Sequence, residues 1–162
     1  MLNVFDQATA SQVEEKTIVP RSMDLALHFG KFVEYWAGKA PVEYLGPAGD
    51  PPCDMTEEVS LNWTGTVGGT LVVRCHKDFL TWLKNSRVYK PSHLCTEREI
   101  FHEMVTLYVV RLIQSFWLSE IFELGLIVPR SSTPEKWPVR EPNVTSAFLA
   151  GDHPVEIRFW MN

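Results

Sequence analysis

One long segment that begins at Thr96 limits the folds open to this chain more than any other feature. Thr96 and Glu99 form the pattern of a capping box, which satisfies two backbone N–H groups at a helix start. We expect one continuous helix over residues 97–118, because apolar residues occupy most of its circumference: Ile100, Phe101, Met104, Val105, Leu107, Tyr108, Leu112 and Phe116. A helix that is apolar nearly all round is buried, so the other elements must surround it.

The segments around this helix have the alternation of antiparallel strands. Val59, Leu61 and Trp63 alternate with polar residues, a glycine-rich turn follows at residues 65–69, and residues 70–75 are apolar and β-branched, so residues 59–75 are predicted to form a β-hairpin. Residues 144–149 and 155–161 alternate in the same way around Gly151-Asp152 and predict a closing hairpin. Short strands are expected at 42–45 and 126–128. The sequence therefore predicts an α+β domain with a mostly antiparallel sheet and a long central helix.

Two further helices are expected. The first begins with Ser22 as its N-cap and ends before Gly38, and Gly30 inside it indicates close packing against another element. A short helix follows over residues 76–86. The polar stretches 1–20 and 129–142 are expected to be an N-terminal arm and a loop, so the domain is predicted to span residues 21–162.

Composition excludes several functional classes. The net charge of −5 argues against a nucleic-acid or membrane partner, because both surfaces are anionic. The three cysteines show no metal or redox spacing, and neither they nor the five histidines predict a metal site. Without a signal peptide or a membrane-spanning run, the chain is expected to be cytoplasmic. Six tryptophans are many for this length and are consistent with an interface.

A polar stripe crosses the first half of the long helix. At 100° per residue, Glu99, His102, Glu103 and Thr106 share this side. The sequence from His102 begins like the zinc-protease motif His-Glu-x-x-His. Because Thr106 occupies the position of the second histidine, the sequence does not predict a zinc site of this kind. Further along, the same stripe becomes apolar, with Val110, Ile113 and Trp117.

The segment Trp63–Val73 resembles the central hairpin of the CheC/CheX/FliY family of chemotaxis phosphatases, most closely its CheX branch. Gly65 and Gly69 bracket the turn and an apolar strand follows. The order of elements from Met23 to Met161 is also similar to that family: one helix, strands, a short helix, a long helix and a final hairpin. The resemblance covers about 140 residues.

The resemblance implies a reaction and its residues. The family hydrolyses phospho-aspartate on response regulators such as CheY, with a Glu-x-x-Asn signature and a small residue four positions further on. Here the glutamate falls on Glu103, the asparagine on Thr106 and the small residue on Val110. The resemblance implies that Glu103 anchors to a lysine of the regulator and that Thr106 holds the attacking water.

The resemblance also implies that this chain needs no cofactor of its own, because the regulator carries the magnesium. It further implies a homodimer that pairs through the sheet, to which large aromatics such as Trp160 would contribute.

The two departures from the signature leave alternatives open. A threonine hydroxyl can accept and donate a hydrogen bond to water, so a phosphatase is chemically feasible. Thr106 can also return its hydroxyl to the helix backbone, and Glu103 can be a solvated surface residue. The second hypothesis is therefore a non-catalytic interaction or dimerisation module. A partner would contact the same face through Glu99, His102, Val110, Ile113 and Trp117.

Overall fold

The structure is a computed structural model of the chain. It describes residues 19–38, 41–47, 55–64, 68–86, 96–124, 130–132 and 138–162, with side chains except at 118–124 and 130–132. The predicted strand at 126–128 and nearly all of the predicted arm lie outside these ranges.

The sheet is antiparallel throughout and has six strands in the order β1-β5-β6-β3-β2-β4. Their bounds are Val42–Gly46 for β1, Glu57–Trp63 for β2, Gly69–Cys75 for β3, Arg130–Ser132 for β4, Val144–Ala150 for β5 and His153–Met161 for β6. The predicted hairpins are confirmed as β2–β3 and β5–β6. The predicted fold class, α+β with a mostly antiparallel sheet, is likewise confirmed.

Strand β4 is the exception, because it lies inside the stretch predicted to be a loop. Its three residues pair with β2, where Leu61 opposes Ser131. Such a short polar segment carries no apolar alternation, and its pairing depends on the free edge of β2. Nothing in its own sequence could therefore indicate a strand.

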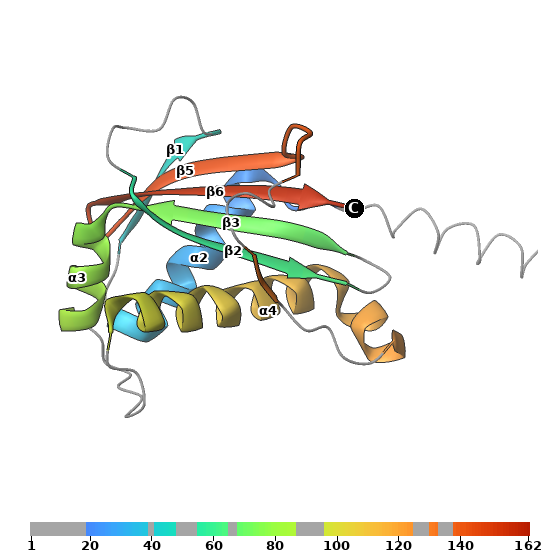
Figure 1. Cartoon of the computed structure of the whole chain (residues 1–162), viewed down its shortest axis with the longest axis horizontal. Helices are drawn as coiled ribbons and strands as arrows, with labels where there is room; N and C mark the ends of the chain where they lie inside the picture. Colours follow the sequence, from blue (N-terminus) through green and yellow to red (C-terminus); the bar gives the residue numbers. More distant parts are fainter. Residues whose placement is uncertain are drawn as a thin grey trace, which may run out of the picture.

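The helices are α2 (Ser22–Ala37), α3 (Lys77–Ser86) and α4 (Glu97–Leu124). Figure 1 shows α2 and α4 along one face of the sheet and α3 at the end of the strands, between β3 and the start of α4. Helix α4 is the predicted long helix, but Trp117 has a non-helical backbone (φ −136°, ψ 34°) that kinks it. The regular part of α4 therefore ends at Phe116, two residues short of the predicted bound. No helix among the described residues is long and apolar enough to cross a membrane.

The core is centred on Phe29, which is fully buried on α2. Its ring meets Tyr108 of α4 edge to face at 5.1 Å between centroids, Phe148 of β5 at 5.3 Å and Phe79 of α3 at 6.4 Å. One side chain thereby joins all three helices to the sheet.

Helix α2 lies close against strand β1 at Gly30. A Cβ atom at this position would lie 2.4 Å from Cγ2 of Val42, a distance that carbon atoms do not tolerate. The close packing that the sequence indicated for Gly30 is thus confirmed. The helix ends, as expected, at Gly38, whose φ of 87° suits glycine.

The predicted N-cap of α2 was wrong, because Arg21 and not Ser22 occupies that position. Asp24 closes the helix start by accepting a hydrogen bond from the backbone N–H of Arg21 at 3.0 Å. The Ser22 hydroxyl instead donates to the carbonyl oxygen of Thr145 at 2.6 Å and accepts from the Tyr44 hydroxyl at 2.7 Å. Two strand residues outside the helix therefore decide the role of Ser22.

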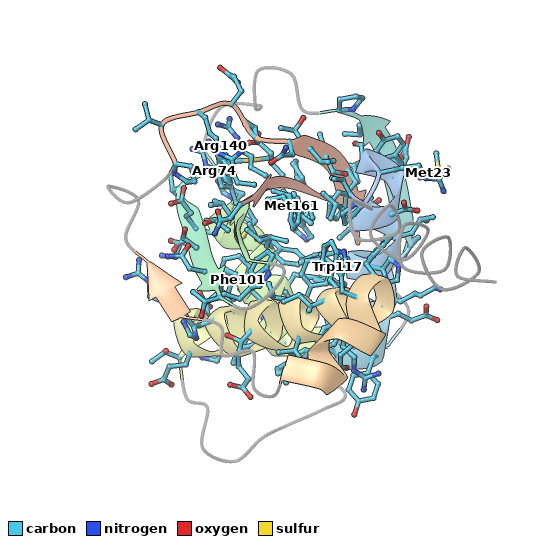
Figure 2. All side chains as sticks on the ribbon, turned by 90° about the vertical axis from the view of Figure 1, so that its right-hand side faces the viewer. Met23, Arg74, Phe101, Trp117, Arg140 and Met161 are labelled. Carbon is cyan, nitrogen blue, oxygen red and sulfur yellow. The ribbon has the colours of Figure 1, made fainter. Side chains whose placement is uncertain are left out.

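The sheet face away from the helices carries charged side chains that are half-buried or buried. Arg74 of β3 lies between Glu58 of β2 and Glu156 of β6 in register, and the Glu58 and Arg74 side chains are 3.4 Å apart. Glu156, only 1% exposed, pairs with Arg158. Figure 2 shows Arg74 on the side of the sheet away from α4. These ion pairs compensate charges that would be costly to bury alone.

Trp160 also lies on this far face and is only 2% exposed. Its indole N–H donates to the carbonyl oxygen of Arg140 at 2.9 Å. The side chain is therefore part of the fold of one chain, and it does not offer the exposed aromatic surface that the dimer expectation invoked.

Candidate functional site

The start of α4 is fixed by the predicted capping box. The Thr96 N–H donates to Oε2 of Glu99 at 3.0 Å, and the Glu99 N–H donates to Oγ1 of Thr96 at 3.1 Å. Glu99 is exposed, but one oxygen of its carboxylate is engaged at the helix start. Its role in the structure is therefore first that of a cap.

The inner side of α4 holds the helix in one orientation. Met104, Val105, Tyr108 and Val109 are at most 1% exposed. The Tyr108 hydroxyl donates to the carbonyl oxygen of Leu25 in α2 at 3.0 Å, and burial raises the pKa of this phenol above its usual value. Because the inner side is anchored in this way, the direction of the outer side is fixed by the core.

The outer side carries the predicted catalytic pair. Glu103 and Thr106 are both half-buried and lie three residues apart, which places them on one helix face beside the exposed His102. The Thr106 hydroxyl donates to the carbonyl oxygen of His102 at 2.8 Å. Its hydrogen is therefore directed at the helix backbone, while the lone pairs of the oxygen stay able to accept a hydrogen bond.

The three apolar residues that continue the stripe differ in their exposure. Val110 is half-buried, whereas Ile113 is 1% and Trp117 3% exposed. Trp117 stacks on Phe159 of β6 with 6.2 Å between ring centroids and 13° between the planes. In Figure 2 the Trp117 side chain lies between α4 and the sheet. Ile113 and Trp117 thus belong to the core, and the accessible part of the predicted partner surface ends at Val110.

The exposed side of α4 turns toward α2 in its second half. Leu107, Arg111 and Ser115 are exposed there and were not among the predicted site residues. Their sequence signal is weak, consisting of one charged residue within an apolar run. The helix crossing that exposes them could not be inferred from one helix alone.

The residues that the structure describes do not form a metal-binding site. No group of three or more His, Cys, Asp or Glu side chains there is arranged to hold a metal ion. Cys75 is a buried free thiol, and burial raises its pKa, so it stays protonated near neutral pH.

Comparison by sequence identifies no relative: no family model matches the chain, and no curated protein does. Comparison with solved structures does identify similar proteins. CheX from Vibrio vulnificus superposes with a TM-score of 0.56 at 10% identity, over 85% of this chain and 96% of that one. A CheC-like superfamily protein from Shewanella sp. PV-4 has a TM-score of 0.53 at 10% identity, over 85% and 94%.

A chemotactic CheC-like protein from Shewanella oneidensis MR-1 gives a TM-score of 0.52 at 9% identity, over 85% of this chain and 92% of that one. The likeness spans almost the full length of each neighbour. At this level of identity it concerns the fold, and the chain has the fold of the CheC/CheX family of chemotaxis proteins.

Proposed function

We propose that this chain acts on a phosphorylated response regulator in bacterial chemotaxis or a related two-component pathway, and that it hydrolyses the phospho-aspartate. The supporting observation is the placement of Glu103 and Thr106. Both lie on the outer face of a helix whose inner side is buried, and they are three residues apart, which is the spacing that the resemblance gives for the glutamate and asparagine of the family signature. A regulator of this kind is cytoplasmic, so we place the chain in the cytoplasm.

In this proposal Glu103 and Thr106 have different roles in the reaction. The Glu103 carboxylate forms an ion pair with a lysine of the regulator and aligns the two surfaces. The Thr106 oxygen, whose own hydrogen bonds to His102, accepts a hydrogen bond from a water molecule and orients that water toward phosphorus. The water oxygen forms a bond to phosphorus while the bond to the aspartate oxygen breaks, which releases inorganic phosphate. The magnesium ion of the regulator compensates the phosphoryl charge.

A second candidate function is a non-catalytic module that only binds the regulator. The hydrogen bond from Thr106 to His102 favours it, because this rotamer gives the water an acceptor but no donor. The side chain of Val110 favours it as well, since a branched residue stands where the family has a small one. In this case the accessible residues Glu99, His102, Glu103 and Val110 would form the contact.

Replacing Glu103 with alanine is expected to raise the KM for a phosphorylated regulator about fivefold and to leave kcat nearly unchanged. The reason is that an ion pair formed equally in the ground and transition states contributes to binding alone. The measurement is phosphate release from a panel of phosphorylated response regulators at limiting and saturating concentrations. Glu141→Ala, which removes an exposed carboxylate from the segment before β5, is the matched control. An unchanged KM in Glu103→Ala would exclude the anchoring role.

We further propose that the chain forms a homodimer. With Trp160 buried, the available surface is the edge of the sheet at β1, where Leu45 is 56% exposed. An edge strand with exposed apolar residues tends to pair. Light scattering should therefore give twice the chain mass of 18.6 kDa, and Leu45→Lys should restore the single mass. A mass of one chain at high concentration would refute the dimer.

A further inference from the structure

A hollow of about 440 Å³ is lined by residues of α2 and α4, among them Leu107, which lies one helical turn after Glu103. Figure 1 shows the two helices near each other. Phe32 and Leu107 supply apolar walls, and Trp36 backs the hollow from the core. One end is bordered by His28, whose ring contacts Phe116 at 5.6 Å between centroids. The full lining is His28, Lys31, Phe32, Tyr35, Trp36, Leu107, Arg111 and Ser115.

The charge of this hollow is opposite to that of the chain. Lys31 and Arg111 line it and no acidic residue does, although the chain carries a net charge of −5. Within the described part of the chain, neither cation takes part in an ion pair. The pKa of His28 is lowered by burial and by Lys31, so the positive charge near pH 7 comes from the two permanent cations. These cations are thus not used by the fold itself.

The dimensions of the hollow favour a compact ligand. The lining residues span positions 28–36 of α2 and 107–115 of α4, which is about 12 Å along each helix. The volume lies in the range of small-molecule sites, which combine mostly apolar walls with a few polar groups. A guanidinium can bind the two oxygens of a carboxylate, sulfonate or phosphate together, and a low-polarity wall beside it strengthens that attraction.

From this combination we infer that the α2–α4 hollow binds a small organic anion. The flat apolar body of the ligand lies between Phe32 and Leu107, and its acidic group is held by Arg111 and Lys31. The inference does not depend on the proposed phosphatase reaction, because neither Glu103 nor Thr106 lines the hollow.

The probe for this site is 8-anilinonaphthalene-1-sulfonate, which joins a flat apolar body to one anionic group. Its uncharged matched partner is N-phenyl-1-naphthylamine, which has the same rings without the sulfonate. Fluorescence titration should show that the chain binds the sulfonate more tightly. Arg111→Glu and Lys31→Glu should each weaken binding of the sulfonate about fivefold or more and leave the neutral probe little changed. Ser115→Trp, whose indole ring fills the hollow, should weaken the binding of both probes.

The control is Lys84→Glu, which makes the same change of charge at an exposed position of α3 outside the hollow. It should leave the binding of both probes unchanged, and circular dichroism should show that every variant keeps the parent fold. The inference is overturned by equal affinity for the charged and neutral probes, by unchanged binding in Arg111→Glu and Lys31→Glu, or by an equal loss in Lys84→Glu.

Discussion

Phe29→Ala is expected to lower the free energy of unfolding by about 3–5 kcal/mol, the loss typical of removing a buried aromatic ring. Phe29 is fully buried and contacts an aromatic residue on each of three other elements: Phe79 of α3, Tyr108 of α4 and Phe148 of β5. The neighbouring elements are held by the sheet and by the other helices, so they cannot collapse into the space that the ring leaves. The measurement is urea unfolding followed by circular dichroism, with the midpoint and the slope both fitted.

Leu27→Ala is the matched control, because Leu27 lies on the same helix but is 50% exposed. Its substitution should cost no more than about 1 kcal/mol. Comparable losses in the two variants would contradict the packing of α2 described above. Since Tyr108 shares α4 with Glu103 and Thr106, Phe29→Ala also tests whether the anchored helix is needed for the proposed activity.

Thr106→Ala is expected to lower the rate of phospho-aspartate hydrolysis about 10- to 100-fold at saturating regulator. The reason is that the alanine variant no longer orients the attacking water, and this orientation matters most in the transition state. Stability should change little, since the hydroxyl bonds only to its own helix backbone at His102. The measurement is single-turnover phosphate release from a purified phosphorylated regulator.

Thr81→Ala provides a close control for this experiment. Thr81 also donates its hydroxyl to the carbonyl oxygen four residues earlier, at Lys77, but it lies on α3 away from the face of Glu103. The Glu97 carboxylate lies 3.2 Å from the same hydroxyl and is the alternative acceptor for its single hydrogen, in an exposed contact. Removing this hydroxyl should leave hydrolysis unchanged. Equal rates for the parent and Thr106→Ala with every regulator tried would reject the catalytic role and leave the binding module.

Thr106→Asn makes the opposite change at the same position. An amide can donate and accept at once, so it offers the water both contacts, and the rate should rise if the side chain of Val110 leaves room. Thr106→Asn combined with Val110→Gly removes that steric condition and should be at least as fast as the single variant. Glycine inside a helix lowers the stability of the folded state by up to about 1 kcal/mol. The folded fraction of the double variant is therefore measured together with its hydrolysis rate.

The sequence alone determined the elements whose signals are local. The capping box at Thr96, the alternation of β2, β5 and β6 and the apolar, β-branched run of β3 depend on residues close together in the chain, and the structure contains each as expected. The hydrogen bond from Thr106 to His102 is of the same kind, since it joins residues four apart and was one of the alternatives that the residue type allowed. Such features follow from residues that are close in sequence, so helix and strand periodicity is enough to predict them.

Only the tertiary structure decided the features that depend on how helices and strands pack against one another. Strand β4 exists because β2 presents an edge, and Ser22 bonds to Tyr44 and Thr145 because two strands come within reach of its hydroxyl. Ile113 and Trp117 continue the polar stripe in sequence, but both are buried in the core, while Arg111 lines the hollow beside α2. A single helix specifies which residues share a face, whereas burial of that face depends on the angle and position of its neighbours, which arise from packing over the whole core.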